Sequence, residues 1–273
     1  MLKFSNQAEV VVAIAQPNIK NLYIHLARLT LMITLYTTPP LWGLPSLTPA
    51  CMKLETWLRM AKVLYKIDTE FNMTLAPKGK IPFIEYKGKL IGDSTLIIEM
   101  FKQKEGIDLD QELTPTERAI SLAFRRMIKE NIYWGLVHIR YNIEKNWRVY
   151  RDVLGTMLSM ETPVPENEPM IESILQTAQT QMYNHGMGRH NDQEISQLIT
   201  ADFQALSDFL GDKPFFMGDK PTTLDATAYA YIGNCIKPPL RHPIVDYVLK
   251  LDNLCQHCER MTEQFFSDMK LGH

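Results

Sequence analysis

The apolar residues of this chain change their spacing once, and that change most constrains the fold. Between Ile33 and Phe101 they form short runs rich in β-branched and aromatic residues, typical of strands, with two helical patterns among them. From Thr114 onward they recur every three or four positions, as on the buried side of helices. A polar stretch, 102–114, separates the two patterns. The sequence therefore predicts an α/β domain at 32–104 and an all-helical domain at 114–273.

The first domain has the predicted order β-α-β followed by β-β-α. Its first helix begins at Thr48-Pro49, a hydroxyl that can cap followed by a first-turn proline, and ends near Lys62. Lys87-Gly88 predicts a tight hairpin turn, and Asp93 or Ser94 caps the last helix. The predicted strands are 33–36, 63–67, 81–86 and 89–91, and the apolar side of the last helix is Leu96, Ile97, Met100 and Phe101.

The second domain is predicted to be a helical bundle. Thr114-Pro115-Thr116-Glu117 is typical of a helix start with a capping box. The three-four repeat continues to Tyr150, which predicts a single helix roughly 50 Å long. Three prolines predict a loop at 161–169. Further helices are predicted at 170–185, 193–210, 224–235, 244–251 and 254–269.

Length and charge narrow the class of protein. A chain of 273 residues is long enough for two domains. Lys and Arg total 29 against 31 Asp and Glu, and a net charge of −2 gives no support to electrostatic nucleic-acid binding. Four cysteines are too few for a disulfide scaffold, so we expect a reducing compartment and a cytoplasmic protein.

The uncharged stretch from Leu29 to Met52 is long enough on paper to span a bilayer. Its prolines remove backbone donors that lipid cannot replace, so no membrane span is expected. Residues 1–31 lack an apolar run long enough for a signal peptide. They are interpreted as an extension, flexible or absent from the working protein, with a weak organelle-targeting sequence as the alternative.

Ile81-Pro82 places a proline at the start of a strand, where it cannot donate to the sheet. With a cis bond, the Ile81 N–H and C=O would face outward and could pair with an extended peptide. The alternative is an ordinary trans proline that starts the strand. Asp93-Ser94 precedes a helix, where a carboxylate and a hydroxyl can receive a ligand's ammonium and carboxylate. The alternative is that they only cap the helix.

Thr48 is the third local feature, because a hydroxyl at a helix N-terminus can donate a hydrogen bond to a bound thiolate. Being a hydroxyl, it cannot form a disulfide. The alternative is that Thr48 is only an N-cap. Cys51, one turn into the helix on its apolar face, is interpreted as a buried core thiol.

Together the hydroxyl-Pro-x-Cys segment, the Ile-Pro hairpin, the Asp-Ser helix start and the helical second half resemble the glutathione transferase superfamily. Gly218-Asp219-Lys220-Pro221-Thr222-Thr223-Leu224-Asp225 resembles that superfamily's capping box in the helical domain. The resemblance implies a thioredoxin-like domain that binds glutathione and a helical domain that completes the cleft. It also implies that Ile81 and Pro82 hold the cysteinyl backbone of glutathione, Asp93 and Ser94 its γ-glutamyl end, and that a homodimer forms.

Within the superfamily, the stretch from Leu44 to Leu58 resembles the subgroup of the failed-axon-connections proteins and metaxins. Thr48 takes the position of the nucleophilic or thiol-polarising residue, where relatives have Ser or Cys. Some members of this subgroup are thought to serve as import or scaffold components rather than as enzymes. The predicted acceptor site lies between the domains, lined by Tyr133 and Trp42. Asn131, Trp134, His138 and Arg140 are further candidates for this lining, and the alternative for the whole set is an ordinary core stripe.

Two other patterns are interpreted as structural. Cys255-Gln256-His257-Cys258 lies in a helical pattern without a second pair at zinc spacing, so no metal site is predicted. His185-Gly186-Met187-Gly188-Arg189-His190 follows no strand and reads as a loop between helices.

Two functions of different class follow. The leading hypothesis is a transferase that conjugates the thiolate of glutathione, its co-substrate, to a small electrophile. The alternative is a non-catalytic binding or assembly module on the same fold. A membrane-associated import component is a third interpretation, and it would need an anchor.

Overall fold

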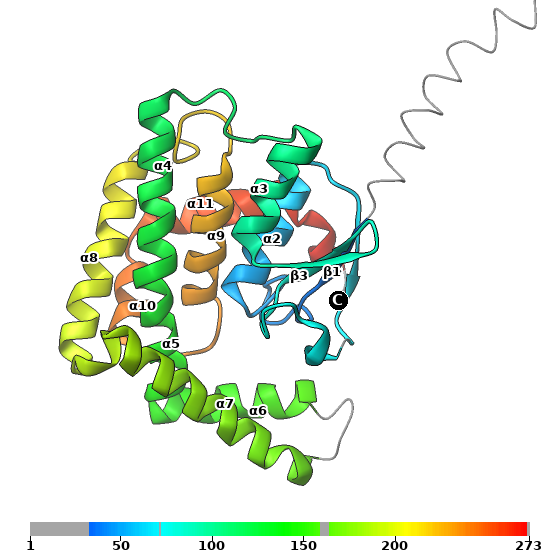
Figure 1. Ribbon diagram of the computed structural model, residues 1–273. Coiled ribbons are helices and arrows are strands. Elements are labelled where there is room, and N and C mark those ends of the chain that lie inside the picture. Colours follow the sequence, from blue (N-terminus) through cyan, green and yellow to red (C-terminus); the bar gives the residue numbers. More distant parts are fainter. Residues whose placement is uncertain (1–32, 71, 159–163, 272–273) are drawn as a thin grey trace, which may run out of the picture.

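The computed structural model describes residues 33–70, 72–158 and 164–271, which form a small sheet domain packed against a helical domain (Figure 1). The extension predicted at 1–31 lies outside the described residues. None of the described helices combines the length and the apolar character that a membrane crossing requires.

The sheet has four short strands in the order β2-β1-β3-β4. β1 pairs parallel with β2, while β3 runs antiparallel to both β1 and β4. A parallel pair requires a crossover connection, and α2 provides it. The strands match the sequence prediction within two residues, and they are β1 (Ile33–Tyr36), β2 (Tyr65–Asp68), β3 (Phe83–Tyr86) and β4 (Lys89–Gly92).

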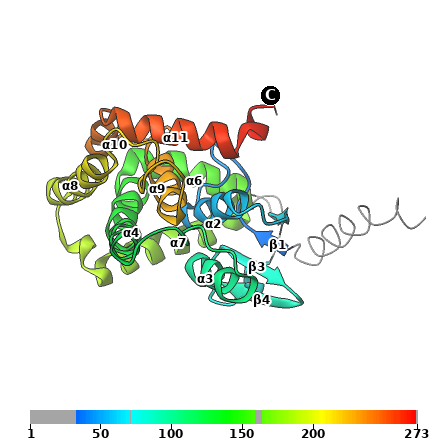
Figure 2. The same ribbon diagram turned by 90° about the horizontal axis from the view of Figure 1, so that it is seen from above.

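Two helices, α2 (Pro49–Met60) and α3 (Ser94–Glu105), pack against each other and the sheet (Figure 2). Their apolar faces share one core in which Trp57 and Phe101 are fully buried. The sequence prediction was wrong about Leu96, which is 51% exposed, because Ile98 takes the buried position. α3 also runs to Glu105, into the predicted linker, and ends at Gly106, whose φ of 67° suits glycine. A short 3₁₀ turn, η1 (Met73–Leu75), lies between β2 and β3.

The long helix predicted from Thr114 to Tyr150 is not continuous. The capping box between Thr114 and Glu117 is present. However, the chain becomes extended at Ile143, and α6 leaves in a new direction (Figure 1). The Asn146 side chain donates to the Ile139 carbonyl, which lies at the break, and so stabilises a bend that apolar spacing alone did not indicate. The segments are α4 (Pro115–Met127), π-helical η2 (Ile128–Ile132), α5 (Tyr133–Val137), π-helical η3 (His138–Asn142) and α6 (Glu144–Leu158).

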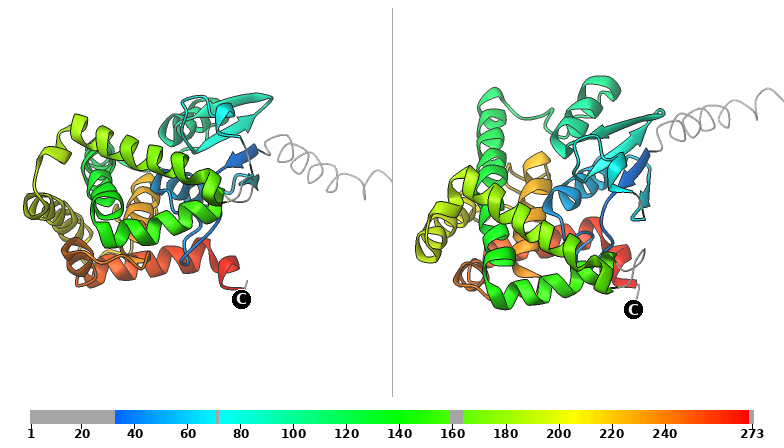
Figure 3. Two further views of the ribbon diagram at one scale, coloured as in Figure 1. Left: turned by 90° about the horizontal axis from the view of Figure 1, so that it is seen from below. Right: turned by 60° about the horizontal axis from the view of Figure 1, so that its bottom comes forward.

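The remaining helices agree with the predicted set, except at the start of α7. This helix begins at Val164, inside the predicted loop, with Pro165 in its first turn and Pro169 within it. Helices α6 and α7 pack together and extend below the sheet domain (Figures 1 and 3). The later elements are α7 (Val164–His185), η4 (Met187–Arg189), α8 (Asp192–Leu210), α9 (Thr223–Ile236), α10 (Pro243–Val248), α11 (Asp252–Phe265) and η5 (Ser267–Leu271).

Helix α9 is the centre of the helical domain and its main contact with the sheet domain. It lies between α4 and α2 and is buried along almost its whole length (Figures 1 and 2). At Gly233 an added Cβ would lie 3.1 Å from Met52, so a small residue allows α2 to approach closely. The Trp57 indole N–H also donates to the Thr223 hydroxyl across this interface. The two domains are therefore joined by tight packing and by hydrogen bonds.

The start of α9 is fixed by the buried carboxylate of Asp225. It accepts hydrogen bonds from the backbone N–H groups of Thr222 (2.7 Å) and Phe216 (2.9 Å), and one from the Thr222 hydroxyl (2.9 Å). The Nε2 atom of His257 on α11 lies 3.0 Å from the same carboxylate. The predicted capping box is thus present, and it also ties α9 to α11.

Candidate functional site

The register of the sheet brings three separate segments to one edge. Tyr36 at the end of β1 pairs with Phe83, and Phe83 pairs with Gly92 at the end of β4. Pro82 precedes Phe83, and Asp93 follows Gly92, so the predicted backbone-binding and helix-start residues are neighbours across the sheet. The loop after Tyr36 leads to Thr48 at the same end of the domain.

The Ile81–Pro82 peptide bond is cis, the first of the two alternatives that the sequence left open. Pro82 is buried and Ile81 is half-buried. Lys80, just before them, donates from Nζ to Gln181 on α7 over 3.2 Å. Helix α7 of the helical domain therefore reaches the segment that the sequence predicts to hold a peptide backbone.

Asp93 caps α3, and one of its oxygens remains free of the cap. Oδ1 accepts hydrogen bonds from the N–H groups of Thr95 (2.8 Å) and Leu96 (3.2 Å). Oδ2 lies 3.8 Å from the ammonium of Lys129, longer than a hydrogen bond. Burial opposes ionisation of the carboxyl, but the two N–H groups and the charges of Lys129 and Lys53 outweigh it, so the pKa of Asp93 is lowered. The carboxylate is therefore anionic at neutral pH and offers Oδ2 to a cation. Ser94, the first helical residue, is buried beside it.

Thr48 lies at the N-cap position of α2, but its side chain makes no capping hydrogen bond. Its backbone N–H donates to the Ser46 hydroxyl over 3.2 Å, and Ser46 is in turn 2.6 Å from the Thr38 hydroxyl. This chain of hydroxyl groups connects the end of β1 to the start of α2, and Thr48 is only half-buried.

Cys51 is a buried core thiol, as the sequence predicted. Burial raises its pKa to about 12, although neighbouring hydroxyl groups, those of Ser46 and Thr48 among them, act in the opposite direction. A thiol with this pKa stays protonated at neutral pH and is a poor nucleophile. Cys51 therefore belongs to the core and supplies no nucleophile at this end of α2.

The sequence analysis missed a group of cations next to Asp93. Lys53 on α2 is only 5% exposed and donates to the Thr95 hydroxyl over 3.1 Å. Burial lowers its pKa to about 7, and the charges of Lys129, Arg125 and Arg126 act in the same direction against the opposing effect of Asp93. Two signals could have found this group. A lysine occupies an apolar position of α2, and basic residues recur on one side of α4.

The predicted acceptor-binding residues are only partly brought together. Trp42 and Tyr133 are both half-buried and pack against the helical core. Arg140 was expected in the cleft, but it is 6% exposed and donates to the Leu47 carbonyl and to Asn234. It joins the domains instead of facing a ligand.

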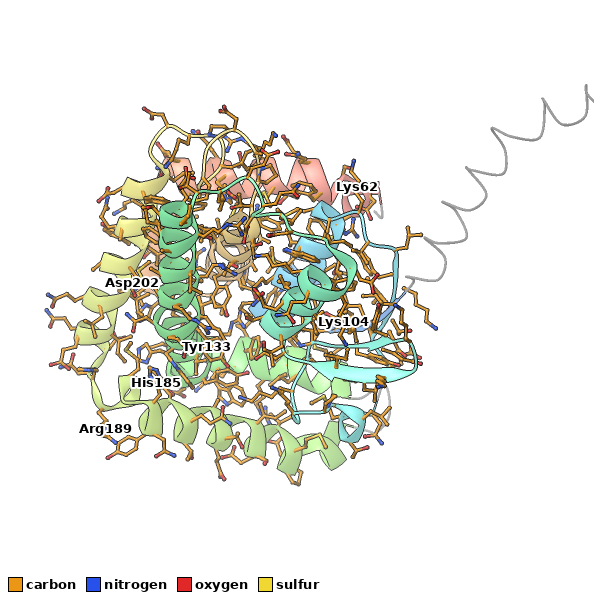
Figure 4. The ribbon with its side chains drawn as sticks, turned by 45° about the horizontal axis from the view of Figure 1, so that its top comes forward. Lys62, Lys104, Tyr133, His185, Arg189 and Asp202 are labelled. Carbon is orange, nitrogen blue, oxygen red and sulfur yellow. The ribbon has the colours of Figure 1, made fainter. Side chains whose placement is uncertain are left out.

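Three other candidates face the helical domain, so their assignment to the cleft is corrected. Asn131 donates to Asp202 on α8, and the Trp134 ring stacks on His185 at the end of α7; Asp202 and His185 are labelled in Figure 4. His138 binds Asp192 at the start of α8. The π-helical segments η2 and η3 on either side of α5 change which residues share a face, and apolar spacing alone does not reveal this, which explains why these residues were misplaced.

His138, Asp192 and His242 could in principle hold a metal ion. Both histidine Nε2 atoms lie 2.7 Å from Asp192 Oδ1. However, His242 Nδ1 accepts the N–H of Ile244, so its proton is on Nε2 and points at the carboxylate. A metal ion bound at Nε2 of His242 would require the ring proton to be on Nδ1, where it would face the N–H of Ile244 and two donors would oppose each other. The arrangement fits a structural carboxylate that joins two helices better than it fits a metal centre.

The two patterns interpreted as structural lie in a helix and in a turn between helices. Cys255 and Cys258 are free thiols on α11, and His257 between them binds Asp225. The segment 186–190 contains the 3₁₀ turn η4 between α7 and α8; in Figure 4, His185 marks the end of α7 and Arg189 lies in the turn.

Two family models match the chain. The glutathione S-transferase N-terminal domain matches residues 49–146, and the glutathione S-transferase C-terminal domain matches residues 199–261. The first match runs from α2 across the domain boundary into α6, and the second lies within the helical domain.

Curated relatives cover most of the chain. An isoprene-epoxide–glutathione S-transferase of Rhodococcus sp. is 32% identical over 239 residues, which is 86% of this chain and 99% of the relative. Failed axon connections of Drosophila melanogaster is 33% identical over 82% of this chain and 56% of its own length. Metaxin-3 of Danio rerio is 25% identical over 83% of this chain and 74% of its own. The likeness to the failed-axon-connections and metaxin proteins is thus confirmed.

Solved structures show the same fold. The beta-etherase LigF of Sphingobium sp. superposes with a TM-score of 0.56 at 14% identity, covering 86% of this chain and 99% of the other. The thioredoxin-like sheet domain followed by a transferase-type helical domain is therefore confirmed. Two domain models match the chain, and a relative that is 32% identical aligns along 99% of its own length. The chain therefore belongs to the glutathione transferase superfamily.

Proposed function

We propose that the chain is a glutathione transferase that joins the thiol of glutathione to a small electrophile such as an epoxide. The observation that supports this proposal is the edge of the sheet, where the Ile81–Pro82 segment and Asp93-Ser94 are neighbours. The hydroxyl of Thr48, at the start of α2, makes no capping hydrogen bond. An epoxide is named because the relative from Rhodococcus carries isoprene epoxide in its name and aligns over nearly all of its length.

Each group has a stated role in this proposal. The backbone of Ile81 pairs with the cysteinyl unit of glutathione, as an added strand does. Oδ2 of Asp93 receives the ammonium of the γ-glutamyl unit, and Ser94 receives its carboxylate. The thiol then lies at the N-terminus of α2, near Thr48. Trp42 and Tyr133 are proposed to line the place of the electrophile.

The chemistry follows from the start of α2. The positive end of the helix dipole and a hydrogen bond from the Thr48 hydroxyl stabilise the thiolate and lower the pKa of the bound thiol. The sulfur attacks an epoxide carbon, a C–S bond forms, and the ring C–O bond breaks. The alkoxide takes a proton from water.

Steady-state conjugation of glutathione to a small epoxide, followed by product mass, tests this proposal. Thr48→Ala should lower kcat/KM by about a hundredfold, the usual effect of losing one donor to a developing anion. Thr48→Ser keeps the hydroxyl and should retain most of the rate. Equal rates for wild type and Thr48→Ala would overturn the role of Thr48.

A non-catalytic module is the second candidate. It is favoured by the ammonium of Lys129, which lies 3.8 Å from Asp93 Oδ2, where the ammonium of a ligand is proposed to bind. The module predicts no conjugate with any small electrophile. Lys129→Met separates the two candidates, because opening the Asp93 carboxylate should strengthen glutathione binding only if that groove is used.

A further inference from the structure

A small pocket lies between the two domains, where α2, α3, α4 and α9 meet. Its volume is about 20 Å³, room for one water-sized group such as a water molecule or a single carboxylate oxygen. Lys53 and Thr95 line its inner side, Ile98 and Leu122 form an apolar wall, and the exposed Arg126 lies at the surface. We call it the basic pocket; Arg125, Lys129, Thr223 and Thr227 complete its lining.

The inner end of the basic pocket is a buried ammonium without a counterion. Lys53 has only 5% of its surface exposed, and its one hydrogen bond goes to the Thr95 hydroxyl. Among residues 33–70, 72–158 and 164–271, no carboxylate lies within 4.0 Å of its Nζ atom. The nearest acidic influence is Asp93, whose Oδ1 is occupied by two N–H groups of α3. A buried charge without a partner costs several kcal/mol, so an anion in contact with Nζ would relieve a real penalty.

The walls of the basic pocket offer further donors. The Nε atom of Arg125 is buried and has no hydrogen-bond partner among the described residues. Thr95 accepts the hydrogen bond of Lys53, so its own hydroxyl proton is available for an acceptor. The other cations that act on Lys53 are Arg126 on α4 and Lys129 on η2, while α9 presents only the hydroxyls of Thr223 and Thr227. Three types of donor therefore surround one small space with a strongly positive potential.

We propose that the basic pocket binds a small carboxylate, whose oxygens accept from Lys53 Nζ, the Thr95 hydroxyl and Arg125 Nε. The apolar wall of Ile98 and Leu122 suits the short alkyl part of such an anion. The enclosed volume admits one end of a carboxylate, and the remaining atoms of a small anion lie at the surface beside the exposed Leu122 and Arg126. This site does not depend on the proposed transferase activity.

Lys53 gives the site a recognisable pH dependence. Without an anion, the pKa of Lys53 is lowered to about 7. Burial is the main cause, and the charges of Lys129, Arg125 and Arg126 add to it, while Asp93 acts in the opposite direction. Only the ammonium form attracts an anion. Affinity should therefore fall by about a hundredfold between pH 6 and pH 9, whereas an exposed lysine would keep its charge over this range.

Acetate is the probe, titrated into the full chain at constant ionic strength with chloride as the balancing anion, and followed by backbone amide shifts of Thr95 and its neighbours. Wild type should show saturable binding. Lys53→Met keeps most of the side-chain length without the charge, and Arg125→Met removes the guanidinium; each should raise the Kd by about tenfold or more. Lys104→Met is the control. It removes an exposed lysine of α3, the helix that carries Thr95, and should leave the Kd unchanged (Figure 4).

The proposal is overturned if acetate shows no saturable effect, if both pocket variants bind as wild type does, or if affinity is the same at pH 6 and pH 9. Repeating the titration with saturating glutathione identifies the source of the carboxylate. Competition would mean that the pocket takes a carboxylate of the bound peptide, and unchanged affinity would mean that it takes a free anion. Either result supports the site.

Discussion

Replacement of Asp225 should be among the most damaging single changes in the chain. The carboxylate is fully buried and receives the N–H groups of Thr222 and Phe216, the Thr222 hydroxyl and Nε2 of His257. Asp225→Ala removes the acceptor and leaves these donors in a water-free environment. The hydroxyl can rotate to another acceptor, but the two backbone N–H groups and the imidazole cannot move far.

The magnitude follows from the three donors that lose their partner. Each buried donor left unsatisfied costs about 1–3 kcal/mol, and water entering the new cavity recovers part of the loss. We therefore expect a loss of about 4 kcal/mol, a large share of the 5–15 kcal/mol that is typical of folded domains. For a chain of this size the corresponding fall in Tm is about 8–16 °C.

Urea unfolding followed by circular dichroism measures this change directly. Asp212→Ala is the matched control, because Asp212 is exposed, and its replacement should change the free energy of unfolding by less than about 0.5 kcal/mol. Asp225→Asn keeps one oxygen for the Thr222 N–H and should lose about 2 kcal/mol. A loss of under 1 kcal/mol for Asp225→Ala would refute the reasoning, because the donors would then have found other partners.

Two further predictions concern the free energy of unfolding: its dependence on pH, which Lys53 controls, and its change in two Gly→Ala variants. Because its pKa in the folded protein is about 7, well below the unfolded value, Lys53 is deprotonated earlier in the folded state. Wild type should therefore gain stability from pH 7 to pH 9 in carboxylate-free buffer, and Lys53→Met should lack this gain in urea unfolding. In helix α5, Gly135→Ala places a Cβ 2.7 Å from Ile199 and should cost about 1–3 kcal/mol, whereas Gly155→Ala on α6 meets ordinary contacts and should stabilise by up to about 1 kcal/mol. Melting curves of both alanine variants test this, and equal shifts would contradict the packing argument.

Local signals in the sequence predicted the elements whose causes are themselves local. The strands, the hairpin at Lys87-Gly88 and the helix starts at Thr114 and Thr222 depend on neighbouring residues, and each is present. The break at Ile143 was missed because it is stabilised by contacts from far along the chain. Asn146 binds the carbonyl of Arg241 as well as that of Ile139.

In the candidate site, too, the features with local causes follow from the sequence and those that depend on distant contacts do not. Pro82 and Asp93, two of the predicted site residues, lie next to each other at one edge of the sheet, since the register follows from the hairpin. The cations around Lys53 were missed because they come from two domains and meet only after α4 packs against α3 and α9. The reverse error concerned His138 and Arg140, whose helical spacing suggested a cleft, while their partners lie on elements that the spacing does not reveal.

Binding of reduced glutathione to wild type and to Asp93→Asn tests the proposed groove most directly. Asparagine keeps an oxygen for the Thr95 and Leu96 N–H groups and tolerates the positive φ of 77° at this position, so α3 stays capped while the charge is lost. We expect saturable binding by titration calorimetry in wild type, an increase in Kd of about tenfold or more in Asp93→Asn, and no change in Asp212→Asn. No binding at millimolar glutathione, or equal affinity in wild type and Asp93→Asn, would contradict the assignment of this edge to the γ-glutamyl end of glutathione.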